Sequence, residues 1–205
     1  MDGKIFRWFN RLADHTGWAH GFFVAYAKFG IVLFAMLLAV AYLDGRQRAD
    51  VRAVAGSVWA AVATLLALGI GQIIGGAIDR ARPYEVISGV HVLIDRTSDF
   101  SFPSDHATAV GAVAAGLWIT SRRWGVIAVA LAGLMAFTRV YVGTHYVSDV
   151  VAGLALGAVV AIAGAAVVLP LLSRAALRMR SGRLRPLVVA TALPAEDPGT
   201  PTTSR

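Results

Sequence analysis

Two short stretches of the sequence carry histidines at spacings suited to catalysis. His145 and Asp149 are four residues apart, so on a helix the carboxylate can hydrogen-bond one imidazole nitrogen. Such a bond fixes the tautomer and raises the basicity of the other nitrogen, as in an activated nucleophile. His106 supplies a second imidazole, a group that exchanges protons near neutral pH and can protonate a leaving oxygen. These residues predict a histidine nucleophile with a separate general acid.

Cationic residues close to both histidines predict that the substrate is a phosphate. Guanidinium groups bind phosphate oxygens in a bidentate manner. Ser104 follows Pro103 at an expected helix start, where free backbone N–H groups and the helix dipole favour an anion. We therefore expect Arg82, Arg139 and Ser104 to bind the phosphoryl oxygens.

The composition predicts that membrane helices position these residues. The chain is 57% hydrophobic and 15% charged, whereas a soluble domain has about 25% charged residues. Five apolar runs approach the roughly 20 residues that a helix needs to cross a bilayer. A lone strand could not satisfy its backbone in lipid, so the fold class is all-α, a polytopic membrane helix bundle. We place the five transmembrane helices near residues 19–43, 53–78, 104–120, 124–143 and 147–172.

The distribution of arginines predicts the orientation of the bundle. With five spans, three basic stretches fall on one side, which is then cytoplasmic together with the C-terminus. These stretches are residues 46–52, 122–123 and 174–185. The loop 79–103 and the turn 143–147 then face the extracytoplasmic side, with all the candidate site residues. The net charge of +7 is accordingly interpreted as an orientation signal in a multi-pass cell-membrane protein, not as a nucleic-acid-binding surface.

The two ends of the chain differ from the spans. Residues 3–14 predict an amphipathic helix in the headgroup layer, with an ordinary helix packed on the bundle as the alternative. Residues 187–205 contain Pro, Thr and Ala with few charges, which predicts a disordered cytoplasmic tail. The domain organisation is thus a membrane domain over 1–186 followed by a tail.

Three motifs resemble signatures of the type 2 phosphatidic acid phosphatase superfamily. Residues 102–106, Phe-Pro-Ser-Asp-His, resemble the second signature, and Arg139, His145 and Asp149 have the spacing of the third. Arg82-Pro83 matches the end of the first. Within the superfamily, residues 10–13, 27–30 and 101–106 look like those of bacterial undecaprenyl-pyrophosphate phosphatases, which recycle the carrier lipid of cell-wall synthesis in the inner membrane.

The resemblance implies a hydrolase and a role for each matched residue. His145 would attack phosphorus and form a phosphohistidine, with Asp149 orienting it. His106 would protonate the leaving group and then activate water. Arg82, Arg139 and Ser104 would hold the phosphoryl oxygens. The family uses no metal and no other cofactor, and its partners would be a polyprenyl or phospholipid phosphate and the bilayer.

Two positions depart from the family pattern. The first signature has a lysine seven residues before its arginine, where this chain has Gly75. Arg80, or Lys28 facing the bundle from the first span, would then supply the missing positive charge; for Lys28, pairing with Asp79 or snorkelling is the alternative. Asp105 stands where glycine is commoner, and its carboxylate would weaken anion binding unless it is turned away or paired.

Three other functions are compatible with parts of this pattern. A broader lipid phosphatase would act on phosphatidylglycerol phosphate or phosphatidic acid. A small membrane transporter would carry polar residues through both halves of the bundle, whereas here they gather at one end. A binding protein that has lost catalysis would not need to keep both histidines and Asp149.

Overall fold

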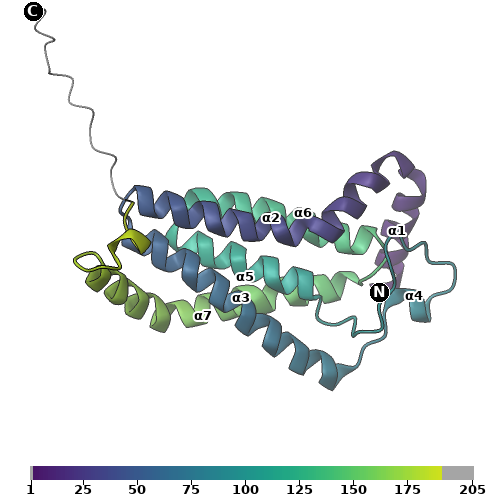
Figure 1. Cartoon of the computed structure of the whole chain (residues 1–205). Coiled ribbons are helices and arrows are strands. Elements are labelled where there is room, and N and C mark those ends of the chain that lie inside the picture. The colour runs from purple at the N-terminus through teal and green to yellow at the C-terminus, as the bar shows by residue number, and fades with distance from the viewer. Residues whose placement is uncertain (1, 191–205) are drawn as a thin grey trace, which may run out of the picture.

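The computed structural model describes residues 2–190, which fold into helices and contain no strand within that range (Figure 1). The elements are α1 (Asp2–His15), α2 (His20–Gln47), α3 (Val51–Ile78), α4 (Pro83–Val86), α5 (Asp105–Thr120), α6 (Arg122–Tyr141) and α7 (Val147–Met179), with 3₁₀ turns at Gly17–Ala19 and Arg185–Leu187. The predicted all-α class is confirmed.

Within residues 2–190, four helices are long and apolar enough to cross a membrane. They lie within Gly17–Gln47, Val51–Val86, Arg122–Tyr141 and Val147–Met179. The third predicted span corresponds to α5, which has only 16 residues, about 24 Å of helix. It lies inside the bundle and packs against α3, α6 and α7 (Figure 1). The chain is therefore a multi-pass membrane protein in which neighbouring helices, rather than lipid, surround the short central helix.

Glycines bring the backbones of α5 and α7 into direct contact. A Cβ atom at Gly153 would lie 2.6 Å from the carbonyl oxygen of Ser104, and one at Gly111 would lie 2.6 Å from that of Leu154. Because the hydrophobic effect between helices is absent in lipid, such close contact of small residues drives the packing. It also fixes the start of α5 against the start of α7.

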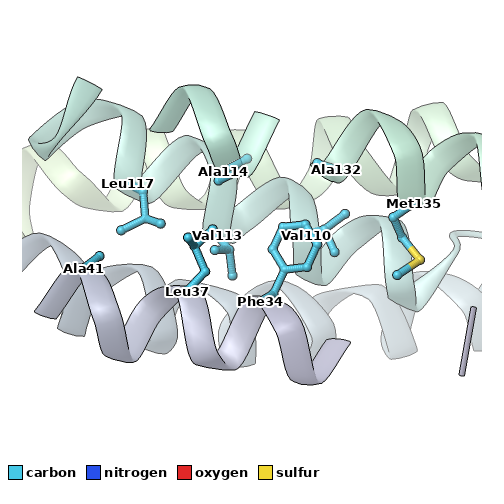
Figure 2. Packing of buried hydrophobic residues seen from close by; sticks show 10 residues of the cluster. Phe34, Leu37, Ala41, Val110, Val113, Ala114, Leu117, Ala132 and Met135 are labelled. Carbon is cyan, nitrogen blue, oxygen red and sulfur yellow. The ribbon is translucent and has the colours of Figure 1, made fainter. Parts of the chain in front are cut away.

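The core on the opposite face of α5 is built from larger side chains. Phe34 and Leu37 of α2 point towards Val110 and Val113 of α5 (Figure 2), and Met135 of α6 belongs to the same buried cluster. With α7 on one face and α2 and α6 on the other, α5 is held at a fixed depth.

Helix α1 packs through a narrow face on the end of the bundle that carries α4. Phe6 is fully buried, and the Asn10 amide donates to the carbonyl oxygen of His91 at 2.7 Å and accepts from its N–H at 3.0 Å. Ile5 and Trp8 remain about half exposed. The helix predicted for residues 3–14 is thus present and packed on the bundle, with apolar side chains left on its outer face.

The ordered chain continues past the predicted boundary at residue 186. Val188 is buried, the Tyr42 hydroxyl donates to the carbonyl oxygen of Leu187 at 2.5 Å, and Ala190 N–H donates to that of Arg46 at 3.0 Å. The first four residues of the predicted tail therefore pack against the end of α2. The rest of that tail, 191–205, lies outside the described residues.

Candidate active site

Four segments of the chain meet at the end of the bundle that carries α1 and α4 (Figure 1). The segment after α3 supplies Arg82, the start of α5 supplies His106, and the end of α6 supplies Arg139. The turn before α7 supplies His145. Antiparallel helices place these starts and ends at the same end of the bundle, as the sequence predicted.

His145 lies at the centre of this cluster and is only 2% exposed. Its Nδ1 atom lies 2.8 Å from the carbonyl oxygen of Ser101. A carbonyl can only accept, so Nδ1 carries the proton and the lone pair of Nε2 is an acceptor. That Nε2 atom lies 3.2 Å from Nη1 of Arg82 and 3.4 Å from Nη2 of Arg139. The unprotonated nitrogen therefore accepts hydrogen bonds from two guanidinium groups.

The surroundings keep the His145 ring neutral. Burial lowers the pKa of His145 to about 4, and the charges of Arg139 and Arg82 act in the same direction, while Asp149 opposes them. A neutral imidazole with an unprotonated Nε2 is the nucleophilic form. The cluster thus keeps His145 at neutral pH in the form that the predicted nucleophile requires.

Asp149 does not bond His145 directly. Its Oδ2 atom is 3.8 Å from Nδ1 of His145, beyond hydrogen-bond range. The same oxygen accepts from the hydroxyl of Ser101 at 2.6 Å and from the N–H of Tyr146 at 2.9 Å. The predicted direct bond is therefore replaced by a link through Ser101, whose carbonyl holds the imidazole and whose hydroxyl holds the carboxylate. The i to i+4 spacing brings the two residues close, but the loop before α5 lies between them.

Arg82 is held by the loop between α4 and α5, residues 87–104, which we call the outer loop. The side chain of Arg82 is 5% exposed. Its Nη2 atom donates to Oδ1 of Asp99 at 2.7 Å, and its Nε atom donates to the backbone carbonyl oxygen of Asp99 at 3.1 Å. Burial alone would raise the pKa of Asp99, but a hydrogen bond from Thr97 and the charge of Arg82 bring it below its ordinary value. Asp99 is consequently an anion beside the predicted phosphate position.

Arg139 and Ser104 have unused hydrogen-bonding capacity. Both are buried, and Nε of Arg139 and Oγ of Ser104 have no hydrogen-bond partner within residues 2–190. Buried polar atoms are normally paired, so such atoms mark a place where a ligand can bind. His106 is partly exposed in the first turn of α5, close enough to Arg139, Arg82 and His145 for their charges to act on its ring.

The two departures from the family pattern have structural explanations. Asp105 is turned towards α3, where the amide of Gln72 donates to both its carboxylate oxygens at 3.0 and 2.9 Å. A Cβ atom at Gly75 would lie 3.1 Å from the Phe100 ring and 3.1 Å from the carbonyl oxygen of Phe102. The outer loop therefore fills the space into which a lysine at position 75 would extend.

Neither predicted substitute for that lysine joins Arg82 and Arg139. Arg80 bonds Asp149 at 2.6 Å and Asp2 at 2.7 Å, so its guanidinium is committed to carboxylates. Lys28 is exposed and pairs with Asp95 of the outer loop at 3.2 Å, rather than with Asp79 or the bundle interior. An ion pair this exposed contributes about 0–1 kcal/mol. The expectation that either residue faces the phosphate is not supported by their positions.

The arrangement suits phosphoryl transfer to a histidine. A tetrahedral phosphate placed between Arg82 and Arg139 would meet Nε2 of His145 on one face, with the backbone N–H groups at the start of α5 nearby. His106 lies within the same group of charges. Within the described chain, no cluster of three or more His, Cys, Asp or Glu side chains could hold a metal ion.

Comparisons with known proteins agree with this geometry. A family model described as the PAP2 superfamily matches residues 56–173, the part of the chain that contains all the clustered arginines and histidines. The chain is 28% identical over 160 residues to undecaprenyl-diphosphatase BcrC of Bacillus subtilis (strain 168), covering 78% of this chain and 80% of the relative. It is 37% identical over 132 residues to a decaprenylphosphoryl-5-phosphoribose phosphatase of Mycobacterium tuberculosis, covering 64% and 67%.

A solved structure shows the same fold. The crystal structure of Aquifex aeolicus LpxE superposes with a TM-score of 0.59 at 22% identity, covering 78% of this chain and 92% of that chain. The family resemblance inferred from the three motifs is confirmed by the family model that matches residues 56–173.

Proposed function

Because the chain belongs to the PAP2 superfamily and is a membrane lipid phosphatase, we propose that it hydrolyses undecaprenyl pyrophosphate, or a similar polyprenyl pyrophosphate, to the monophosphate and inorganic phosphate. The observation that carries this proposal is the position of Nε2 of His145 between Arg82 and Arg139. An unprotonated imidazole nitrogen beside two phosphate-binding groups is what attack on phosphorus requires.

In the first step, Nε2 of His145 attacks the terminal phosphorus. The N–P bond forms as the bond from phosphorus to the bridging oxygen breaks. His106, which the negative charge of the bound pyrophosphate favours in its protonated form, donates its proton to that oxygen. Arg82 and Arg139 offset the charge on the equatorial oxygens, where the transition state concentrates it. The products are a phosphohistidine and the lipid monophosphate.

In the second step, water attacks the phosphohistidine. His106, now neutral, takes a proton from the water as its oxygen bonds phosphorus and the N–P bond breaks. Inorganic phosphate leaves, and His145 regains the neutral form, in the Nδ1–H tautomer that its bond to Ser101 favours. The same imidazole serves as acid and then as base, so His106 ends the cycle in the protonation state in which it began.

The polyprenyl part of the proposal is supported by the relatives. Both the Bacillus and the Mycobacterium proteins carry names that specify phosphates of long isoprenoid lipids. The lipid tail would lie in the bilayer beside the helices while its headgroup enters the cluster. The basic residues at the opposite end of the bundle support an extracytoplasmic active site and a cytoplasmic C-terminus, with a role in recycling the carrier lipid of the cell wall.

Phosphate release by the purified protein in detergent tests this proposal. The wild type should hydrolyse undecaprenyl pyrophosphate, and His145→Ala should abolish release. His15→Ala removes an exposed histidine of α1 and is the matched control, expected to keep full activity. Rapid quenching should trap an acid-labile, alkali-stable phosphoprotein in the wild type but not in His145→Ala.

The same preparation distinguishes the broader lipid phosphatase. Phosphatidylglycerol phosphate and phosphatidic acid are assayed beside the polyprenyl substrate. A higher kcat/KM for either phospholipid would overturn the polyprenyl assignment while leaving the mechanism in place. Full activity in His145→Ala would overturn the mechanism itself.

A further inference from the structure

Arg80 connects the buried carboxylate of the active site to the N-terminal helix. Its Nη1 atom donates to Oδ1 of Asp149 at 2.6 Å and to the hydroxyl of Ser148 at 2.6 Å. Its Nη2 atom donates to Oδ2 of Asp2 at 2.7 Å. The guanidinium also lies over the ring of Tyr146, 4.2 Å from its centroid. One side chain thus joins α1, the segment after α3 and the start of α7.

Asp2 is itself fixed at this junction. The hydroxyl of Ser148 bonds its Oδ2 atom, and the N–H of Ser148 donates to Oδ1 at 3.4 Å. Burial would raise the pKa of Asp2, but these bonds and the charge of Arg80 lower it below the ordinary value. Asp2 is therefore an anion that bonds both Arg80 and the first turn of α7.

Asp149 needs such a partner because it is completely buried. Its side chain is 0% exposed, and among the described residues Arg80 is the only permanent cation within ion-pair distance. A buried carboxylate without a countercharge is strongly destabilised. Arg80 therefore supplies the countercharge that holds Asp149 in place, and Asp149 accepts from the hydroxyl of Ser101.

We propose that Asp2 and Arg80 are positioning residues of the reaction, through which the N-terminal helix sets the orientation of the nucleophile His145. This inference rests on the proposed function. The path runs from Asp2 to Arg80, then to Asp149 and to Ser101, whose carbonyl oxygen accepts from Nδ1 of His145. Among the described residues, neither Asp2 nor Arg80 bonds Arg82, Arg139 or His145.

The position of this path predicts a particular kinetic signature. Misorienting Nε2 of His145 slows attack on phosphorus and lowers kcat. The groups that bind the ground-state phosphate are untouched, so KM should change little. A purely structural role, docking α1 on the bundle, would instead lower the folded fraction and leave kcat per folded molecule unchanged.

The test uses the full chain with any purification tag at the C-terminus. Variants Asp2→Asn, Arg80→Gln, Arg80→Lys and the double Asp2→Asn/Arg80→Gln are assayed on undecaprenyl pyrophosphate. Asp14→Asn is the matched control, because Asp14 lies on the same helix, is half-exposed and bonds only His91. Size exclusion and thermal unfolding give the folded fraction by which each kcat is normalised.

We expect kcat to fall about tenfold in Asp2→Asn and about 100-fold in Arg80→Gln, with KM within about twofold of the wild type. Asp14→Asn should match the wild type. Arg80→Lys keeps the cation and should recover part of the loss. Since Asp2 acts through Arg80, the double variant should be no slower than Arg80→Gln alone.

Three outcomes would overturn the inference. Unchanged normalised kcat in Asp2→Asn and Arg80→Gln would leave only the docking role. Multiplying losses in the double variant would show that Asp2 acts independently of Arg80. Equal loss in Arg80→Lys and Arg80→Gln would show that the countercharge is not the cause. Absence of hydrolysis by the wild type, in contrast, would remove the proposed function as well.

Discussion

The carbonyl oxygen of Ser101 lies 2.8 Å from Nδ1 of His145, in the position that a carboxylate was expected to hold. A backbone carbonyl cannot be protonated or removed by a side-chain substitution. The tautomer of the nucleophile is therefore fixed by the course of the loop before α5. Asp149 acts one bond further away, through the hydroxyl of Ser101.

This geometry predicts the cost of replacing Asp149 with Asn. Loss of an orienting carboxylate that directly sets the tautomer costs about 10⁴-fold in kcat. Here the Ser101 carbonyl keeps Nδ1 protonated, so Asp149→Asn should lose only the electrostatic contribution and the anchoring of Ser101. We expect kcat to fall about 10²-fold. Steady-state kinetics on folded protein measures this, and a loss near 10⁴-fold would show that Asp149 controls the tautomer itself.

Asp99 is predicted to compete with the substrate for Arg82. Its carboxylate pairs with Nη2 at 2.7 Å, yet Arg82 is also held by the carbonyl oxygens of Asp99 and Thr144. Asp99→Asn therefore removes a negative charge near the phosphate while most of the positioning remains. We expect KM to fall about two- to fivefold with kcat nearly unchanged. A higher KM would indicate that the carboxylate is needed to orient Arg82.

The pH dependence follows from the lowered pKa of His145. The folded value of about 4 lies below the ordinary 6.5, because the ring is buried beside two guanidinium groups. His145 should therefore remain neutral as pH falls from 7 to 5. Single-turnover phosphorylation measured over this range should show its acid limb near pH 4, and a limb near 6.5 would contradict a buried neutral ring.

The same shift affects stability with a defined sign. The unfolded chain binds a proton at His145 near pH 6.5, whereas the folded chain binds it only near pH 4. The free energy of unfolding should therefore decrease as pH falls between these values, by on the order of 1 kcal/mol per pH unit from this group. His145→Gln, compared with the wild type in thermal unfolding at pH 7 and 5, should lose this dependence.

The contact between α5 and α7 should tolerate no added methyl group at Gly153. A Cβ atom there would lie 2.6 Å from the carbonyl oxygen of Ser104, so Gly153→Ala must separate the two helices. We expect a loss of about 1–3 kcal/mol in stability, together with reduced activity because Ser104 and His106 move. Gly133→Ala is the control: a Cβ atom at Gly133 has no neighbour within 4 Å and should be neutral or slightly stabilising. Equal stability of the two variants in thermal unfolding would contradict tight packing.

The sequence by itself determined the helical membrane bundle, its family and the residues that meet at one end. Apolar runs of membrane-spanning length specify helices because backbone groups in lipid must bond within their own segment. Arg139, His145 and Asp149 lie close together along the chain, so local helix and turn geometry brings them together. The clustering of Arg82 with them follows from the antiparallel order of the helices.

Only the tertiary structure decided which partner each charged group takes. Ser101 bonds His145 across 44 positions, Gln72 bonds Asp105 across 33, and Arg80 bonds Asp2 across 78. Each contact depends on how the outer loop and α1 fold back over the bundle, which no spacing in the sequence records. Arg80 was therefore assigned to phosphate from its charge alone, although two carboxylates hold it. Charge and residue type identify the groups that can bind, whereas the nearest buried partner is set by packing between elements far apart in the chain.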